Sequence, residues 1–189
     1  MAVSWDDIKR DMSWEPSEDE VNYFMGEALN EAKKALSLNE IPIGCVIEQD
    51  GKIIGRGHNL TETAKDTTAH AEMVAIREAS EYLKDNLGWR RLTKCHMYVT
   101  MEPCSMCAGA LVWSRIEDVV IGVMDPKAGG CGSVLDITGC EKLNHRVNVH
   151  QIKDSPLKDE CGDIIKKFFK DLRDIKKTEK LLKESRGNL

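Results

Sequence analysis

Two stretches of the chain decide the fold: His70-Ala71-Glu72 and, further along, Pro103-Cys104-Ser105-Met106-Cys107. Together they offer one imidazole, two thiolates and one carboxylate. An imidazole and two thiolates are a ligand set suited to zinc, and they leave one tetrahedral position for water, as in a catalytic zinc site. Glu72 lies close enough to His70 to reach that water without being a ligand. The pattern therefore predicts a catalytic zinc centre with Glu72 beside it, held by His70, Cys104 and Cys107.

The spacing of these residues is explained if they lie on helices. Residues 71–79 are good helix formers, so we expect His70 in the first turn of that helix. Pro103 suits the first position of a second helix, where its missing N–H costs nothing. Cys104 and Cys107, three residues apart, would then lie on one helical face. Because helix N-termini carry partial positive charge that favours thiolates, two helix starts are predicted to converge on one metal ion.

Taken alone, these residues leave other interpretations open. A C-x-x-C pair is also typical of a redox site, or of two buried cysteines that happen to lie close together. The upstream His70-Ala71-Glu72 and the proline directly before Cys104 favour zinc. Glu72 by itself could be a solvated helix carboxylate. Only its place in the pattern makes it a candidate proton carrier.

The length and composition indicate one globular domain. The chain has 189 residues, of which 41% are hydrophobic and 31% charged, as in ordinary soluble proteins. We divide it into an N-terminal extension of unassigned role, residues 1–16, and a single domain spanning 17–189. The start lacks the apolar region of a secretory signal, and no apolar run is long enough to cross a membrane. Seven cysteines, an odd number with two or more assigned to metal, favour a reducing, cytoplasmic location.

The net charge of −5 is unevenly distributed along the chain. Residues 1–40 carry −6, residues 41–152 carry −2 and residues 153–189 carry +3. The basic C-terminal segment is a candidate surface for nucleic acid. Charge alone favours a solvated helix face equally well.

Alternating helix and strand patterns define the expected fold. Ser17 and Glu20 form a capping box that starts a helix reaching Leu38. After it the periodicity predicts strands over 41–48 and 52–57, a helix from 70 to about 83, a strand over 95–100, a helix over 103–115, a strand over 117–123, a Gly-rich loop over 125–133, a strand over 147–152 and a helix over 161–184. Helices alternating with five strands predict an α/β fold, a three-layer α/β/α sandwich around a five-stranded mixed sheet.

The H-x-E…P-C-x-x-C pattern is the signature of zinc-dependent nucleobase deaminases. Over residues 20–177 the chain resembles one family of them, the bacterial tRNA adenosine deaminases, which convert the wobble adenosine of a tRNA anticodon to inosine. The HAE and PCxxC parts are common to nucleobase deaminases. The segments that favour the tRNA enzymes are Asp125–Ser133, Asn144–Val147 and Phe168–Lys170. The resemblance also covers 41–44, 57–59, 68–72 and 98–110.

This resemblance implies a cytidine-deaminase-like sandwich, one zinc ion per subunit and hydrolytic deamination. Zinc would lower the pKa of a bound water, and Glu72 would pass protons from that water to N1 of the purine and to the departing ammonia. Asn59 matches the family position that hydrogen-bonds the target base, and Ala71 contributes a backbone N–H there. From propensity alone, Asn59 is equally a turn residue that follows a strand.

The resemblance also implies an RNA partner, an anticodon stem-loop whose target base is splayed into the pocket. Seven residues match family positions beside the RNA: Asp125, Lys127 and Ser133 in the Gly-rich loop, and Phe168, Phe169, Lys170 and Arg173 in the terminal helix. The helical pattern alone is equally consistent with core packing of the two phenylalanines, and we expect one of them to pack. A homodimer is implied by resemblance only, and a heterodimer stays open.

Two other functions are compatible with parts of this sequence. One is a deaminase of free nucleobases or nucleotides, such as guanine or cytosine, which the HAE and PCxxC motifs do not exclude. The other is a noncatalytic zinc-bearing RNA-binding subunit, which we would expect to have lost the proton carrier, whereas Glu72 is intact. Three cysteines outside the catalytic set are expected to be small packed residues rather than a second metal site. They are Cys131, Cys140 and Cys161.

Overall fold

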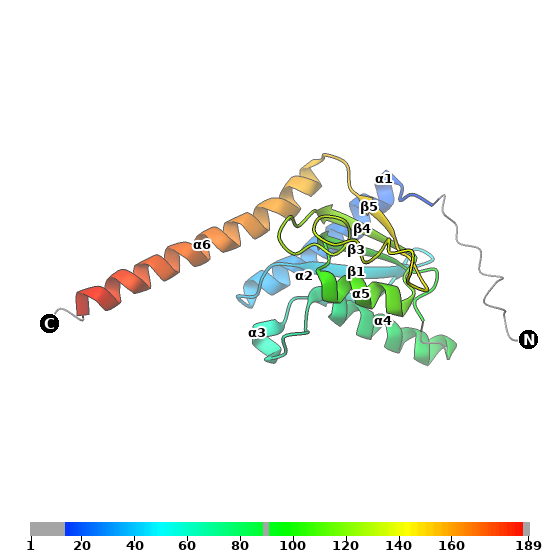
Figure 1. The fold of residues 1–189 in the computed structure, drawn as a ribbon, viewed down its shortest axis with the longest axis horizontal. Coiled ribbons are helices and arrows are strands. Elements are labelled where there is room, and N and C mark those ends of the chain that lie inside the picture. The colour runs from blue at the N-terminus through cyan, green and yellow to red at the C-terminus, as the bar shows by residue number, and fades with distance from the viewer. Residues whose placement is uncertain (1–13, 89–90, 187–189) are drawn as a thin grey trace, which may run out of the picture.

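A computed structural model of the chain describes residues 14–88 and 91–186. Residues 1–13, most of the predicted N-terminal extension, lie outside the described residues. The chain forms one five-stranded sheet in the order β2-β1-β3-β4-β5, with helices on both faces (Figure 1). The predicted three-layer α/β fold with a mixed sheet is confirmed.

The sheet combines an antiparallel half with a parallel half. β1 (Gly44–Gln49) and β2 (Lys52–His58) form the predicted hairpin. Its turn contains two residues with positive φ, Asp50 and Gly51, as a tight two-residue hairpin requires. β1 also pairs antiparallel with β3 (His96–Met101), whereas β3, β4 (Asp118–Val123) and β5 (Asn148–Gln151) are parallel. Because parallel strands end at the same edge, the segments that follow β3 and β4 emerge side by side.

One face of the sheet is covered by α4 (Ala71–Leu87) and α5 (Ser105–Ser114). The small buried side chains of α4 let it lie close to the hairpin, and glycines in β2 provide the matching space. A Cβ atom on Gly57 would lie 2.0 Å from the carbonyl oxygen of Ala71. The backbone of β2 therefore contacts the backbone of α4 directly where α4 begins. This contact places His70 against the sheet.

The opposite face is covered by the N-terminal helices and the start of α6. The helix predicted over 17–38 forms as a continuous series: α1 (Glu18–Glu20), the π-helical turn η2 (Val21–Met25) and α2 (Gly26–Ser37). The predicted capping box is present, since the Ser17 hydroxyl accepts from the Glu20 N–H and the Glu20 carboxylate accepts from the Ser17 N–H.

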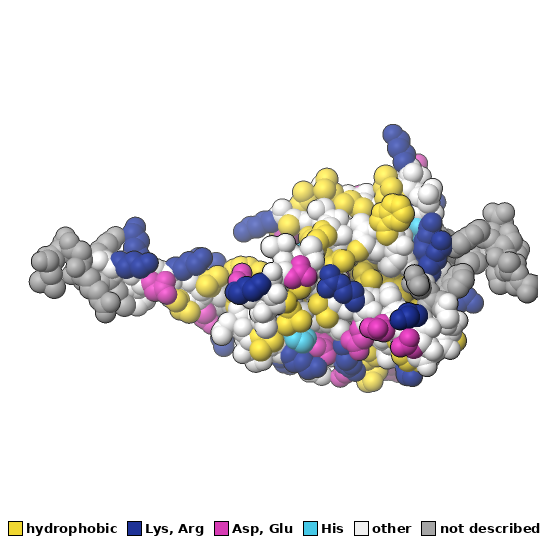
Figure 2. Space-filling view, turned by 90° about the horizontal axis from the view of Figure 1, so that it is seen from below, with side chains coloured by type: hydrophobic (Ala, Val, Ile, Leu, Met, Phe, Trp, Pro, Cys, Tyr) yellow, Lys and Arg dark blue, Asp and Glu magenta, His cyan; other side chains and the backbone are white. Residues whose placement is uncertain are grey.

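The terminal helix α6 (Pro156–Arg186) begins five residues before the predicted start and projects from the body (Figure 1). Cys161 and Ile165 are buried against the sheet, whereas Ile175 and Leu181 are 55% and 58% exposed. Lysine and arginine side chains, mixed with acidic ones, line this projecting helix, and hydrophobic side chains gather on the body (Figure 2). Within the described residues, no helix is long and apolar enough to cross a membrane.

Two local predictions need correction, and one short element was not predicted. His70 does not lie in the first turn of α4 but at its N-cap, with an extended backbone (φ −70°, ψ 156°). Pro103 does not begin α5, because the helix starts at Ser105 and Cys104 is the N-cap. A short helix, α3 (Thr61–Ala64), was not predicted. At an N-cap the extended backbone turns the side chain across the helix end, so both ligands face the space between the two helices.

The close helix–sheet contact leads to a stability prediction. A Cβ on Gly44 would lie 2.0 Å from the carbonyl oxygen of Ala28, so Gly44→Ala should destabilise the fold by about 3 kcal/mol, the upper end of overpacking costs. Gly26 has nothing within 4 Å of its added Cβ and lies in α2, so Gly26→Ala should stabilise by about 0.5–1 kcal/mol. Urea unfolding measures both changes, and equal midpoints for the two variants would contradict this account.

Candidate active site

The predicted metal ligands converge at two helix starts. His70 is the N-cap of α4, Cys104 is the N-cap of α5, and Cys107 lies in the first turn of α5. The Nδ1 atom of His70 is 3.6 Å from the Sγ atom of each cysteine. One ligand atom from each of the three residues lies within 4.8 Å of the other two. Tertiary structure thus brings together residues that are far apart in sequence.

The donor set and its spacing fit zinc. With Zn–S near 2.3 Å and Zn–N near 2.0 Å, a tetrahedral ion holds its nitrogen and sulfur ligands about 3.5 Å apart. The observed separation of 3.6 Å matches this geometry. Three protein ligands also leave one tetrahedral position for water or substrate, which is the pattern of a catalytic rather than a structural site.

Protonation in this cluster is unequal. A hydrogen bond from Cys107, reinforced by one from His70, lowers the pKa of Cys104 to about 3 despite partial burial. The same hydrogen bond, together with burial, raises the pKa of the Cys107 thiol. The bond to Cys104 also raises the pKa of His70. A bound cation would hold both cysteines as thiolates.

Glu72 lies in the first turn of α4 and is only 3% exposed. Burial raises the pKa of its carboxyl group, and the negative charge of Cys104 adds to this effect. A carboxyl group with a raised pKa can both accept and return a proton near neutral pH. Ala71, at the first position of the same helix, is buried, and its N–H has no partner within the helix because it belongs to the first turn.

Asn59 is buried and held by a carboxylate that sequence reasoning missed. Its Nδ2 atom donates to Oε2 of Glu40 at 3.0 Å and to the hydroxyl of Thr61 at 3.1 Å. Glu40, itself only 1% exposed, also accepts from the Thr61 hydroxyl and from the backbone N–H of Thr63 at 2.6 Å. Burial raises the pKa of Glu40, but the bonds from Thr63 and Thr61 outweigh it and the net shift is downward. An ionised Glu40 therefore orients the Asn59 amide.

Glu102 holds the Gly-rich loop that follows β4. Its carboxylate accepts from the backbone N–H groups of Asp125 at 2.8 Å, Cys131 at 3.0 Å and Ser133 at 3.1 Å, and from the Ser133 hydroxyl. Burial raises the pKa of Glu102, but these hydrogen bonds, led by that of Ser133, lower it overall. Glu102 lies directly before Pro103, and the sequence motifs assign it no role. A carboxylate directly before the metal-ligand motif was the signal that could have identified it.

Two loop glycines allow the loop to lie directly against the metal-ligand segment. A Cβ on Gly129 would lie 2.2 Å from Oε2 of Glu102, so any larger side chain would displace the carboxylate. The backbone N–H of Gly130 donates to the carbonyl of Pro103 at 2.8 Å. The loop is therefore fastened to the two residues directly before Cys104, the N-cap of α5.

The structure brings some of the predicted RNA residues near this site and not others. Asp125 and Ser133 belong to the loop fastened by Glu102, and Lys127 is exposed on it with its N–H bonded to the Asp125 carboxylate at 2.9 Å. On α6 Phe168 is half-buried and Phe169 is exposed, their rings contact each other, and neither belongs to the buried core clusters of the described residues. Within the described residues, no hydrogen bond, ion pair or ring contact joins Phe168, Phe169, Lys170 or Arg173 to the metal ligands.

The three additional cysteines are packed or partly exposed free thiols. Cys131 is 5% exposed, Cys161 is fully buried and Cys140 is half-buried. Burial raises the pKa of Cys131 and of Cys161 to about 12, so both are neutral thiols. None of the three belongs to a metal-ligand cluster in the part of the chain that is described.

Comparison with known proteins agrees with this geometry. Residues 18–123 match the family described as the cytidine and deoxycytidylate deaminase zinc-binding region. The chain is therefore an enzyme of the zinc-dependent deaminase class. It is 46% identical to the tRNA-specific adenosine deaminase of Bacillus subtilis over 154 residues, which cover 82% of this chain and 91% of the relative. It is also 46% identical to that of Aquifex aeolicus, over 80% of this chain and 95% of the relative. The chain belongs to the tRNA-specific adenosine deaminase family.

Two solved deaminase structures have a fold similar to that of this chain. A structure from studies of A-to-I editing by tRNA:A34 deaminases at the wobble position has a TM-score of 0.68 and 37% identity, covering 76% of this chain and 99% of that one. Guanine deaminase from Bacillus subtilis has a TM-score of 0.52 and 30% identity, covering 74% of this chain and 88% of that one. The predicted cytidine-deaminase-like sandwich is confirmed.

The hydrogen bonds of Glu102 lead to a prediction about loop mobility. Glu102→Gln removes a charged acceptor, and each bond to such an acceptor contributes about 1.5–3 kcal/mol. Amide hydrogen exchange at Asp125, Cys131 and Ser133 should therefore accelerate by about tenfold or more. Glu141→Gln, which replaces an exposed carboxylate, is the matched control. Unchanged exchange at the three amides in Glu102→Gln would show that Glu102 does not hold the loop.

Proposed function

We propose that this protein deaminates the wobble adenosine in a tRNA anticodon loop to inosine, by zinc-dependent hydrolysis. The observation that carries the proposal is the convergence of His70, Cys104 and Cys107 beside buried Glu72 in a chain of the tRNA-specific adenosine deaminase family. One zinc ion per subunit is the cofactor that this donor set fits.

In this mechanism His70, Cys104 and Cys107 hold the metal, and Glu72 moves the protons. Zinc, when bound, supplies a water molecule with a pKa lowered towards neutrality. The Glu72 carboxylate would accept the two protons released during hydrolysis and deliver one to N1 of the purine and one to the departing amino group. The raised pKa of the Glu72 carboxyl suits both directions of transfer. Asn59, oriented by Glu40, hydrogen-bonds the base, and the Ala71 N–H donates at the same edge of the pocket.

The RNA partner is an anticodon stem-loop with its target base turned out of the stack. Asp125, Lys127 and Ser133 contact it from the loop that Glu102 fastens beside Cys104. The terminal helix lies further out and contacts the RNA backbone and bases with Phe168, Phe169, Lys170 and Arg173. Basic side chains bind phosphates and aromatic rings stack on unpaired bases, which is how single-stranded RNA is held.

The active form is a homodimer paired through α5 and its surroundings. Almost every side chain of α5 is apolar, and a helix of that kind is normally buried on all sides. Yet Trp113 is 81% exposed, and Val134, Leu135 and Leu143 are between 40% and 52% exposed. Large exposed apolar side chains, tryptophan above all, mark protein interfaces.

We also propose a cytoplasmic location, where tRNA is found, and one catalytic domain spanning 17–189.

The two rival functions fit less well. The guanine deaminase from Bacillus subtilis is less similar in both fold and sequence than the A34 deaminase structure, with a TM-score of 0.52 against 0.68 and an identity of 30% against 37%. A noncatalytic subunit would have no use for a buried carboxyl group beside the ligand cluster, yet Glu72 is present and buried.

The substrate assignment is tested with an anticodon stem-loop that carries adenosine at the wobble position. Inosine formation is measured on the stem-loop, with free adenine, guanine and cytosine assayed alongside. We expect inosine in the stem-loop and no turnover of free bases. Turnover of a free base without inosine formation in the stem-loop would contradict the proposal and indicate a deaminase of free nucleobases.

The role of Glu72 is tested separately from metal binding. Glu72→Ala should leave zinc bound and lower turnover by about 10²–10⁴-fold or more, because proton transfer by a positioned group contributes that much. Glu81→Gln, an exposed carboxylate on the same helix, is the matched control. Zinc content by elemental analysis accompanies each rate, and loss of zinc in Glu72→Ala would contradict a role limited to proton transfer.

The dimer is tested by placing a charge at its proposed centre. Trp113→Arg should convert a particle of twice the chain mass to one of the single-chain mass in light scattering. Leu181→Arg changes an exposed apolar residue on the projecting part of α6 and should leave the dimer intact. A wild-type protein with the mass of one chain would contradict the proposal.

A further inference from the structure

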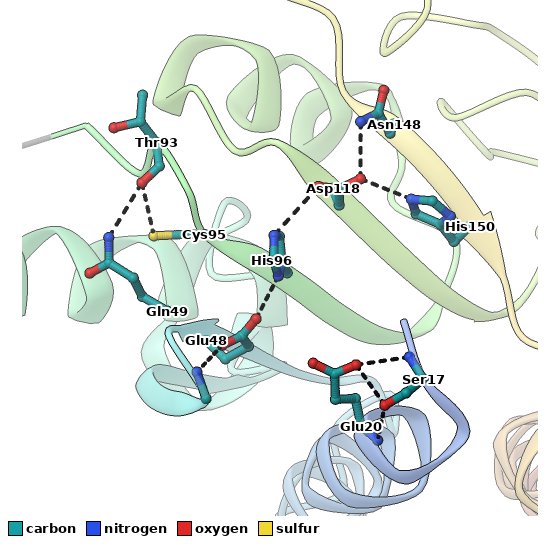
Figure 3. A network of polar contacts seen from close by, with 11 residues as sticks. Ser17, Glu20, Glu48, Gln49, Thr93, Cys95, His96, Asp118, Asn148 and His150 are labelled. Carbon is teal, nitrogen blue, oxygen red and sulfur yellow. Dashed lines mark hydrogen bonds and ion pairs between the residues drawn. The ribbon is translucent and has the colours of Figure 1, made fainter. Parts of the chain in front are cut away.

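A second cluster of histidine and carboxylate side chains lies at the amino ends of β3 and β4 (Figure 3). The metal ligands of the active site follow the carboxyl end of β3. His96 and Asp118 are the first residues of β3 and β4 and are register partners. Glu117 directly precedes β4, and Glu48 lies beside His96 on β1. The length of β3 separates this cluster from Cys104 by about 20 Å. None of these residues belongs to the deamination site.

Hydrogen bonds orient the cluster from the outside. The Nδ1 atom of His96 lies 2.6 Å from Oε1 of Glu48. Oδ1 of Asp118 accepts from Nδ2 of Asn148 at 3.0 Å and contacts Nε2 of His150 at 2.8 Å. Glu48 and Asp118 are almost fully buried, at 3% and 1% exposure. These bonds fix the His96 ring and the Asp118 carboxylate in one orientation each.

The side-chain atoms that converge make no hydrogen bond within this network, although His96 Nε2 and Asp118 Oδ2 are close enough for an ion pair. His96 Nε2 and Asp118 Oδ2 lie 3.6 Å apart, which is too long for a hydrogen bond. The side chain of Glu117 makes no hydrogen bond or ion pair within residues 14–88 and 91–186. One ligand atom of each of these three residues lies within 4.8 Å of the other two. Zinc holds neighbouring nitrogen and oxygen ligands about 3.4 Å apart.

The ion pairs found within the cluster are made by histidines. Among the described residues, no lysine or arginine forms an ion pair with Glu48, Glu117 or Asp118. Buried carboxylates are stabilised by hydrogen-bond donors or by a nearby cation, because an unpaired charge in the interior is strongly destabilising. Among the ion pairs of the described residues, the positive charge beside these carboxylates comes from protons on His96 and His150, and a bound metal ion would supply it in their place.

We propose that this edge of the sheet binds a divalent transition-metal ion of the zinc type through His96 Nε2, Asp118 Oδ2 and the Glu117 carboxylate. Glu48 would then accept from the second ring nitrogen of His96, which is the usual outer support of a metal-bound histidine. Trp14 stacks on the His96 ring with centroids 3.8 Å apart and covers it. The ion would join β3 to β4 beneath the segment that leads into α1. We assign the ion a structural role, because it would join two neighbouring strands.

Zinc stoichiometry tests this site on the full chain. After equilibrium dialysis against Zn²⁺ buffered at micromolar free concentration, elemental analysis should find two zinc ions per wild-type chain. Glu117→Gln, which disturbs no hydrogen bond, and His96→Asn should each retain only the ion of the catalytic site. The second ion should raise the melting temperature of the wild type and not of either variant, because a ligand stabilises only the state that binds it.

Glu141→Gln replaces an exposed carboxylate outside the cluster and should keep both ions. A single zinc ion per wild-type chain would overturn the proposal and leave protons on His96 and His150 as the balancing charge. A second ion that persists in both Glu117→Gln and His96→Asn would overturn it equally, since that ion would bind elsewhere. Deamination assays play no part in the test, so its outcome is independent of the proposed substrate.

Discussion

The site depends on the meeting of two helix N-termini at one edge of the sheet. α4 and α5 each begin where a ligand occupies the N-cap, and His70 Nδ1 reaches 3.6 Å from both cysteine sulfurs. The positive ends of the two helix dipoles stabilise thiolates there. This meeting requires α4 to approach the hairpin at backbone contact distance, which the glycines of β2 permit. A side chain at Gly57 would move the start of α4 and with it His70.

Buried carboxylates organise the surroundings of the metal ligands. Glu40 holds the Asn59 amide, and Glu102 gathers the loop after β4 beside Cys104. Both carboxyl groups have lowered pKa values because several donors stabilise their charge more than burial opposes it. Glu72 differs, since burial dominates and its pKa is raised. Carboxylates with many donors serve as fixed acceptors, whereas the one with few donors can exchange a proton.

The two ends of the parallel strands β3 and β4 carry side chains of different chemistry. The segment after the carboxyl end of β3 carries the thiolate ligands Cys104 and Cys107. The segment after β4 is the loop whose backbone N–H groups donate to Glu102. The amino ends carry imidazole and carboxylate groups that face one another across neighbouring strands (Figure 3). Parallel pairing explains why the active-site residues cluster at one end of the strands and the His96 cluster at the other. Equivalent positions of adjacent parallel strands lie side by side at each end.

The sequence by itself determined the elements and the chemistry. The HAE and PCxxC motifs predicted the ligand set, and alternating helix and strand periods predicted the five strands and the sandwich, because ligand type and local periodicity are properties of short segments. Only the tertiary structure decided which residues from distant segments contact one another. It made His70 and Cys104 N-caps rather than helical residues, since the cap geometry depends on how each helix meets the sheet. It also gave roles to Glu40, Glu102 and the His96 cluster, whose partners are distant in sequence and visible only once the strands pair.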